Sequence, residues 1–102
     1  MAQSSLRVRE EEELLVVDDT DLGDLSELIV YNDDFNTFDW VIQCLIEVCK
    51  HSPLQAEQLT MLVHFKGKAT VKTAPFSLLK PMKDALVDRG LSAVIETIKK
   101  RT

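Results

Sequence analysis

Positive charge, cysteine and long hydrophobic runs are all scarce in this sequence, and each shortage excludes a class of function. Lys and Arg number 12 against 17 Asp and Glu, which gives a formal net charge of −5. A protein that binds nucleic-acid phosphates needs clustered basic residues. The one such cluster, Lys99-Lys100-Arg101, lies at the C-terminus and is interpreted as a solvated tail. We therefore expect no nucleic-acid partner.

No apolar run approaches the length that a transmembrane helix needs. The N-terminal residues also lack the cationic start and apolar stretch of a secretory signal. The two cysteines, Cys44 and Cys49, are five positions apart within a helical pattern and so lie on different sides of a helix. That spacing favours neither a disulfide nor a metal site. We expect a cytoplasmic protein with small apolar thiols, no membrane partner and no cofactor.

The distribution of charge divides the chain into three parts. Residues 1–26 form an acidic extension, in which four consecutive glutamates precede a short Leu-Val run and further aspartates. Like charges at this density resist compaction, so we expect this extension to be largely flexible. Residues 27–98 have the mixed composition of one small globular domain, and residues 99–102 are a basic tail.

The first predicted elements of the domain are a strand and a helix. The stretch "ELIVY", residues 27–31, carries apolar side chains on both faces, which predicts a strand covered on both sides. Apolar residues at helical spacing then predict a helix over residues 37–51. Asn36 is its expected N-cap, and Asp39 places a favourable negative charge in its first turn.

The stretch "SPLQ" predicts the start of a second helix. Ser52 is a capping residue, Pro53 suits the first helical position and Gln55 completes a capping-box pattern. The helix is expected to stop at Gly67, which can adopt the left-handed C-cap conformation. It carries two nearly opposite apolar stripes, Leu54 with Met61 and Phe65, and Ala56 with Leu59 and Val63. A surface helix needs only one such stripe, so the second is expected to meet more core or a ligand pocket.

The remaining pattern predicts a strand over residues 68–74, a helix over residues 75–90 and a strand over residues 91–98. Pro81 interrupts the third helix, which either starts near Lys80 or bends there. The element order β-α-α-β-α-β indicates an α+β domain. We expect a small three-stranded, mainly antiparallel sheet with three helices packed on one face.

Four polar residues stand out, namely Asn32, Asp33 and Asp34 after the first strand and His64 late in the second helix. Asn-Asp-Asp is a common turn composition, so one interpretation is purely structural. Catalysis or metal binding would pair His64 with an aspartate, but no nucleophile occupies a suitable context and no Walker, GxGxxG, GxSxG or HExxH motif occurs. The third interpretation is that acceptors from these residues surround an ammonium group. A neighbouring apolar pocket, with Val63, would then suit a peptide N-terminus.

Two stretches carry a resemblance to a known family. "NDDFNTFDWV" resembles the N-D-D-[YF]-[TN]-x-[MF]-[ED]-[FYW]-V signature of the ClpS adaptors, and "LTMLVHFKGKATV" resembles their second-helix motif V-H-x-x-G-K-A. The resemblance covers about Glu27 to Glu96 and implies an α+β fold with three strands and three helices. It also implies an adaptor rather than an enzyme. Such an adaptor recognises an N-terminal Leu, Phe, Tyr or Trp, an N-degron, and delivers its bearer to a Clp AAA+ unfoldase, ClpA or a relative, that works with the ClpP peptidase.

The resemblance also implies residue roles. Asn32, Asp34 and His64 would contact the α-amino group of the degron, while Asp33 would contribute negative potential beside them. The pocket for the first side chain would be lined by Tyr31, Asn36, Phe38, Val41, Thr60, Val63 and Leu91. The alternative is a non-catalytic protein–protein interaction domain without a terminal-amine pocket, because fold alone does not determine function.

This chain departs from the family pattern at the pocket. Thr37 replaces a frequent proline, and Phe38 and Thr60 replace frequent methionines. Methionine adapts its shape more readily than phenylalanine, so the family's preferences among Leu, Phe, Tyr and Trp do not transfer. The third-helix region lacks the Glu and Lys pattern with which some members dock on the unfoldase, which leaves the identity of that partner open. The acidic extension would be engaged by the unfoldase rather than by the degron.

Overall fold

The computed structural model describes residues 25–98, so the basic tail and all but two residues of the predicted acidic extension lie outside the described part. The predicted element order and the α+β class are confirmed. The elements are β2 (Leu25–Tyr31), α2 (Phe38–Cys49), α3 (Pro53–Lys66), β3 (Lys68–Pro75), α4 (Phe76–Asp88) and β4 (Ser92–Thr97). β2 starts two residues before the predicted boundary of the domain at residue 27.

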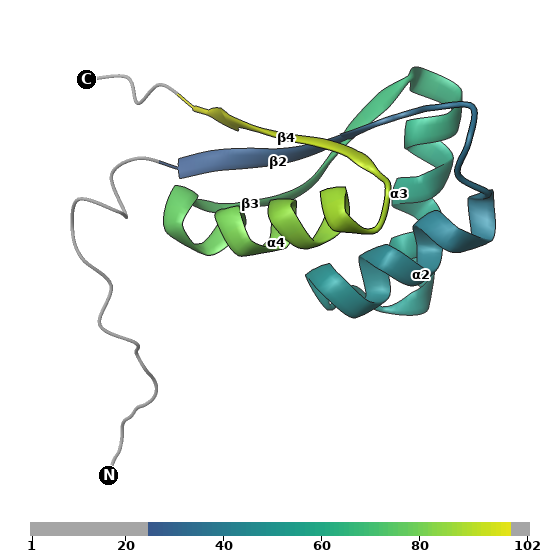
Figure 1. Ribbon diagram of the computed structural model, residues 1–102, viewed down its shortest axis with the longest axis horizontal. Helices are drawn as coiled ribbons and strands as arrows, with labels where there is room; N and C mark the ends of the chain where they lie inside the picture. Colours follow the sequence, from purple (N-terminus) through teal and green to yellow (C-terminus); the bar gives the residue numbers. More distant parts are fainter. Residues whose placement is uncertain (1–24, 99–102) are drawn as a thin grey trace, which may run out of the picture.

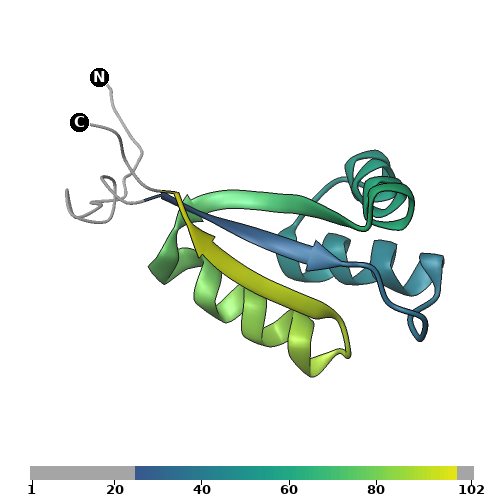
Figure 2. The ribbon, with the colours of Figure 1, turned by 90° about the horizontal axis from the view of Figure 1, so that it is seen from above.

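The sheet has the strand order β3-β2-β4, and both pairings are antiparallel. At the end of β2, Tyr31 pairs with Lys68 of β3 and with Ser92 of β4. Figure 1 shows the strands nearly edge-on, with α4 beneath them and with α2 and α3 at the end where β2 finishes. Figure 2 shows the broad face of the same sheet. This arrangement brings the loop after β2 next to α2 and α3.

The core lies between the sheet and the helices. Leu28 and Val30 of β2 belong to its main cluster, together with Leu45 of α2 and Leu79 of α4. Ile29 alternates with them and is only 4% exposed, although it lies outside that cluster. Its Cα partners on the two flanking strands are Thr70 and Val94. β2 is therefore buried on its second face by its position in the centre of the sheet rather than by a second layer of helices.

The start of α2 corrects one sequence prediction. Its N-cap is Thr37 rather than Asn36, because Thr37 Oγ1 accepts a hydrogen bond from Trp40 N–H at 3.1 Å. The Asn36 amide is instead held by Asp33 and Gly90. Asp39 lies in the first turn as predicted. Both residues cap well, and the acceptors Asp33 Oδ2 and Gly90 O, which engage the Asn36 amide, leave the capping role to Thr37.

The predicted caps of α3 are confirmed, and its two apolar stripes differ in burial. Ser52 accepts from Gln55 N–H at 3.1 Å, and Gly67 closes the helix with a φ of 94°. The stripe containing Ala56, Leu59 and Val63 is buried in the core. The opposite stripe is not covered by any described residue, since Leu54, Met61 and Phe65 are 63%, 42% and 73% exposed. Of the two expected alternatives, more core is excluded for this stripe within residues 25–98, whereas Met61 and Phe65 line an open surface pocket, so the alternative of a ligand pocket stays a prediction.

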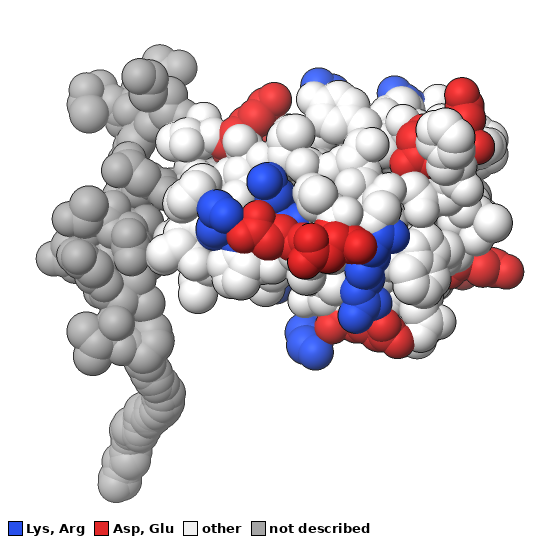
Figure 3. Space-filling model, in the orientation of Figure 1, with Lys and Arg blue, Asp and Glu red and all other residues white. Residues whose placement is uncertain are grey.

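Pro81 lies inside α4, which begins at Phe76. The alternative in which the helix starts near Lys80 is excluded. Acidic and basic side chains lie intermixed on the face of the molecule that Figure 3 shows. The ion pairs of α4 and the turn after it include Lys80–Asp84 at 2.6 Å and Arg89–Glu47. The charges on this face therefore largely compensate one another.

The two cysteines are free and buried, as the sequence indicates. Burial raises the pKa of the Cys49 thiol to about 11, so the reactive thiolate is scarce at neutral pH. No helix in residues 25–98 combines the length and apolar character required to cross a membrane.

Candidate functional site

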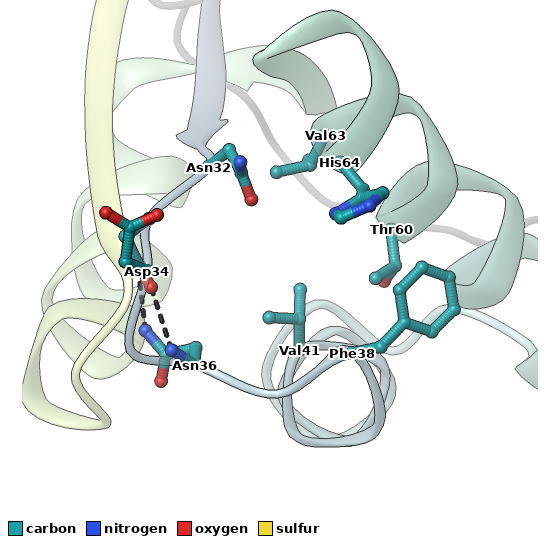
Figure 4. Close-up of a pocket in the computed structure, with 9 residues that line it drawn as sticks. Asn32, Asp34, Asn36, Phe38, Val41, Thr60, Val63 and His64 are labelled. Atoms are coloured by element: carbon teal, nitrogen blue, oxygen red, sulfur yellow. Dashed lines mark hydrogen bonds between the residues drawn. The ribbon is translucent and has the colours of Figure 1, made fainter.

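A cavity of about 220 Å³ opens where the end of β2, the start of α2 and the end of α3 meet. Figure 4 shows its side chains arranged around a central space. Asn32, Asp34 and Asn36 of the loop after β2 lie on one side, and side chains of α2 and α3 lie on the other. The lining consists of Asn32, Asp33, Asp34, Asn36, Phe38, Val41, Thr60, Val63 and His64.

Asp33 holds the loop between β2 and α2 in shape. Its Oδ1 accepts from the backbone N–H groups of Phe35 and Asn36, both at 2.8 Å. Its Oδ2 accepts from Asn36 Nδ2 at 2.7 Å. An aspartate that bonds the backbone two and three residues ahead forms a tight Asx-type turn. Asp33 is therefore a structural residue of the site, with both carboxylate oxygens already occupied.

These hydrogen bonds also set the charge of Asp33. The bond from the Asn36 backbone is the main cause that holds the pKa of the Asp33 carboxyl below its usual value, with partial burial opposing it. The Asn36 side chain and the Phe35 backbone lower it further. Hydrogen bonds to a carboxylate favour its ionised form. The loop thus carries a fixed negative charge at neutral pH, beside the carboxylate of Asp34.

Two further bonds tie this loop to the turn between α4 and β4. Asn36 Nδ2 also donates to the carbonyl oxygen of Gly90 at 2.9 Å, and Trp40 Nε1 donates to that of Arg89 at 3.0 Å. Gly90 has a φ of 95°, a conformation in which glycine is not strained. A distant part of the chain thereby fixes the polar side of the cavity.

The opposite wall is apolar. Val41 of α2 and Val63 of α3 are buried beneath the cavity, and Phe38 is partly exposed at its edge. Thr60 is also buried, and its hydroxyl donates to the carbonyl oxygen of Ala56 at 2.8 Å. Because that bond satisfies the hydroxyl within the helix, Thr60 behaves here as a small apolar residue. The cavity therefore offers an apolar surface of the kind that holds an aliphatic or aromatic side chain.

Three polar side chains of the lining have no hydrogen-bond partner among the described residues, namely Asn32, Asp34 and His64. The backbone N–H of Asn32 donates to Gly67 O at 2.9 Å, which places Asn32 beside the end of α3. In Figure 4 the Asn32 amide points into the space in front of His64. These groups supply an amide oxygen, a carboxylate and an imidazole nitrogen around one opening.

His64 is flanked by two aromatic rings. Its ring centroid lies 6.2 Å from that of Phe38 and 5.0 Å from that of Phe65, with edge-to-face angles of 83° and 78°. Such T-shaped contacts are favourable arrangements for aromatic pairs. The imidazole therefore has aromatic neighbours on two sides, and no described residue hydrogen-bonds its nitrogen atoms.

The structure brings together most, but not all, of the residues predicted from the sequence. The four amine-site residues and five of the seven pocket residues line the cavity. Tyr31 and Leu91 do not. Lys68 Nζ lies 5.7 Å above the Tyr31 ring, and Leu91 is buried in the core cluster. The turn interpretation of Asn-Asp-Asp is confirmed for Asp33, but sequence reasoning did not name Asn36 as its partner, although their three-residue spacing was a usable signal.

The arrangement fits binding rather than bond cleavage. The lining contains no cysteine or serine, and its one hydroxyl, that of Thr60, already donates within α3. No group of three or more potential metal ligands occurs among residues 25–98. Three acceptors, one of them anionic, are what a protonated amine requires when it leaves water. The site can therefore hold an ammonium group and an apolar side chain at the same time.

Comparison with known proteins finds relatives of this chain. Residues 23–94 match the family described as "ATP-dependent Clp protease adaptor protein ClpS". A protein of that name from Nitratidesulfovibrio vulgaris (strain Miyazaki F) is 34% identical over 55 residues, which are 54% of this chain and 55% of that relative. Another from Thermosynechococcus vestitus is 36% identical over 67 residues, 65% of this chain and 71% of the relative. The match thus spans little more than half the length of the first relative.

A solved structure has the same fold. It is that of Agrobacterium tumefaciens ClpS2 bound to L-phenylalaninamide, with a TM-score of 0.69 and 21% sequence identity. The alignment covers 74% of this chain and 99% of that one.

Proposed function

Because the chain belongs to the ClpS family of Clp protease adaptors, we propose that it captures proteins with a large hydrophobic N-terminal residue. It then delivers them to a Clp AAA+ unfoldase, ClpA or a relative, that works with ClpP. By its name the family consists of adaptors rather than enzymes. The acceptors without partners in the cavity support binding of the terminal amine, and the apolar wall supports binding of the first side chain.

One observation carries this proposal: Asn32, Asp34 and His64 have no hydrogen-bond partner within residues 25–98, whereas the side chains of Asp33, Asn36 and Thr60 beside them are engaged. Asp33 and Asn36 bond each other, and Thr60 bonds its own helix. All three side chains are exposed, so water can hydrogen-bond them in the free chain and a ligand can take the place of that water. An α-ammonium group supplies three donors. Asp33 adds negative potential to the same opening without contacting the amine.

The ligand of the structural neighbour has the chemistry that this site would require. L-phenylalaninamide combines a free α-amino group, a phenylalanine side chain and an uncharged amide in place of the carboxylate. It therefore stands for the first residue of a polypeptide. In our chain Phe38, Val41, Thr60, Val63 and Asn36 would surround the side chain. Burying a Leu or Phe side chain there contributes about 1.5–3 kcal/mol.

The direct test is fluorescence-anisotropy titration with peptides that differ only in their first residue: Phe, Leu, Met and Ala. We expect the Phe or Leu peptide to bind at least about tenfold more tightly than the Ala peptide, because the Ala side chain leaves the apolar wall exposed to water. Equal affinity for all four peptides would contradict the proposal. It would instead favour a general interaction domain that has no terminal-amine pocket.

The acidic extension gives a second prediction. A chain that begins at residue 25, where β2 starts, retains every residue of the cavity. We expect it to bind a Phe peptide as the full chain does, but to support little degradation of a Phe-tagged reporter by the unfoldase and ClpP. Starting instead at residue 27 removes two paired residues of β2 and is a poorer comparison. Normal delivery by the shortened chain would show that the extension is dispensable.

A further inference from the structure

We infer that Phe65, an exposed residue outside the cavity lining, positions the imidazole of His64 for the ligand. This inference rests on the proposed function, since it concerns how the same site presents an acceptor to the amine. Phe65 is 73% exposed, whereas a large apolar side chain at the end of a helix normally gains by burial. The ring contact with His64 offers a reason for an exposed phenylalanine at this position.

The first step of the argument is that no hydrogen bond orients His64. The imidazole has no such partner among residues 25–98, unlike the other histidine, His51, whose Nε2 donates to Val71 O at 2.6 Å. In binding sites a second hydrogen bond usually fixes which ring nitrogen carries the proton and where the other points. His64 must obtain its orientation by other means.

The second step is the geometry of the flanking rings. The Phe65 contact is the closer of the two, at 5.0 Å between centroids compared with 6.2 Å for Phe38. Phe38 lines the cavity and can move when a side chain enters, whereas Phe65 does not line it. An entering side chain would therefore contact Phe38 but not Phe65, so the Phe65 contact is the one we expect to persist when a ligand binds. It restricts rotation of the imidazole so that one nitrogen faces the opening.

The third step is that the position of Phe65 separates this role from general stability. Phe65 belongs to the exposed stripe of α3 and is absent from the core cluster. Leu54 is a matched position at the other end of the same stripe and is 63% exposed. Replacing either residue by alanine removes exposed apolar surface, but only Phe65 contacts His64.

The test measures His64 itself before it measures binding. In the free full-length chain, nitrogen-15 NMR of the ring nitrogens reports the tautomer balance of each histidine. We expect Phe65→Ala to shift the His64 signals and leave those of His51 unchanged. Phe65→Tyr, which keeps the ring, and Leu54→Ala should leave both histidines as they are. His64 signals that do not respond to Phe65→Ala would overturn the inference.

Affinity for a peptide with a free N-terminal Phe provides the second measurement. We expect Phe65→Ala to weaken it about two- to tenfold, the range that an aromatic pair contributes. Phe65→Tyr should restore it, and in a His64→Ala chain the Phe65→Ala change should have no further effect. An equal loss in both backgrounds would overturn the positioning role. Failure of the unmodified chain to bind any peptide would overturn the proposed function, while the ring signals still decide the role of Phe65.

Discussion

A peptide that begins with a free phenylalanine is expected to bind at least about a hundredfold more tightly than the same peptide acetylated at its N-terminus. Acetylation removes the positive charge and two of the three donors that Asn32, Asp34 and His64 would engage. Hydrogen bonds to charged groups contribute about 1.5–3 kcal/mol each, so the loss of two corresponds to two or more decades in Kd. Competition anisotropy with both peptides measures the ratio.

A matched control separates the terminal amine from charge in general. The peptide should contain a lysine several residues from its N-terminus, and a second version should be acetylated on that side chain alone. This version loses the same charge but keeps the α-ammonium group, so its affinity should change by less than about threefold because exposed charges are screened. If the N-acetylated peptide bound as well as the free one, the cavity would not be a terminal-amine site.

Replacement of Asp33 by alanine is expected to reduce both stability and affinity, whereas replacement of Asp34 should reduce affinity alone. Asp33→Ala removes the acceptor of the bonds from Phe35 N–H, Asn36 N–H and Asn36 Nδ2. Loss of such charge-assisted bonds costs about 1–3 kcal/mol of unfolding free energy. Asp34 has no hydrogen-bond partner among the described residues, so Asp34→Ala should stay within about 0.5 kcal/mol of the unmodified chain.

Urea unfolding, followed through the fluorescence of the single tryptophan Trp40, measures the stability of each variant. Peptide anisotropy measures its affinity. Trp40 suits this purpose because its indole contacts the turn after α4. Both variants should bind a Phe peptide at least about tenfold more weakly than the unmodified chain. For Asp33→Ala the loss follows from a disordered loop. If Asp33→Ala and Asp34→Ala had equal stability, the loop-holding role of Asp33 would be refuted.

The stability that Asp33 provides should depend on pH. Because its pKa is lower in the folded chain than the reference value of 3.8, the unfolded chain binds the proton more tightly. The contribution of Asp33 is therefore fully present above the unfolded-state pKa and is lost as the pH falls through the folded-state pKa. The urea midpoints of the unmodified chain and of Asp33→Ala should differ at pH 7 and approach each other below 3.8. A constant difference across this range would contradict the assignment.

Local signals in the sequence predicted the parts of the fold that local chemistry determines. Ser52 and Gly67 cap α3 as expected, because a serine before Pro53 and a glycine after a helical pattern each satisfy nearby backbone groups. Asn36 was misassigned because it and Thr37 are both good capping residues. What selects Thr37 is the carbonyl of Gly90, 54 positions away in the chain, to which the Asn36 amide donates. No local pattern contains that information.

The candidate site was predicted as a set of residues more accurately than as a set of roles. Helical spacing groups Phe38 with Val41, and Thr60 with Val63 and His64, and all five line the cavity. Periodicity did not show which apolar stripe of α3 would face the core, since both stripes are equally regular. Nor did it show that Leu91 lies in the core rather than at the cavity. These outcomes depend on how α3 and the last turn dock on the sheet.

All nine residues that line the cavity come from one continuous stretch, Asn32 to His64. α4 and β4 give it no lining side chain and hold it from outside through the main-chain oxygens of Arg89 and Gly90. Every residue has a carbonyl oxygen, so these two hydrogen bonds do not depend on which side chains occupy the two positions. In evolutionary terms, the side chains of α4 can therefore diverge to suit a different partner while ligand recognition is inherited unchanged. The fold separates two properties that selection can then adjust independently.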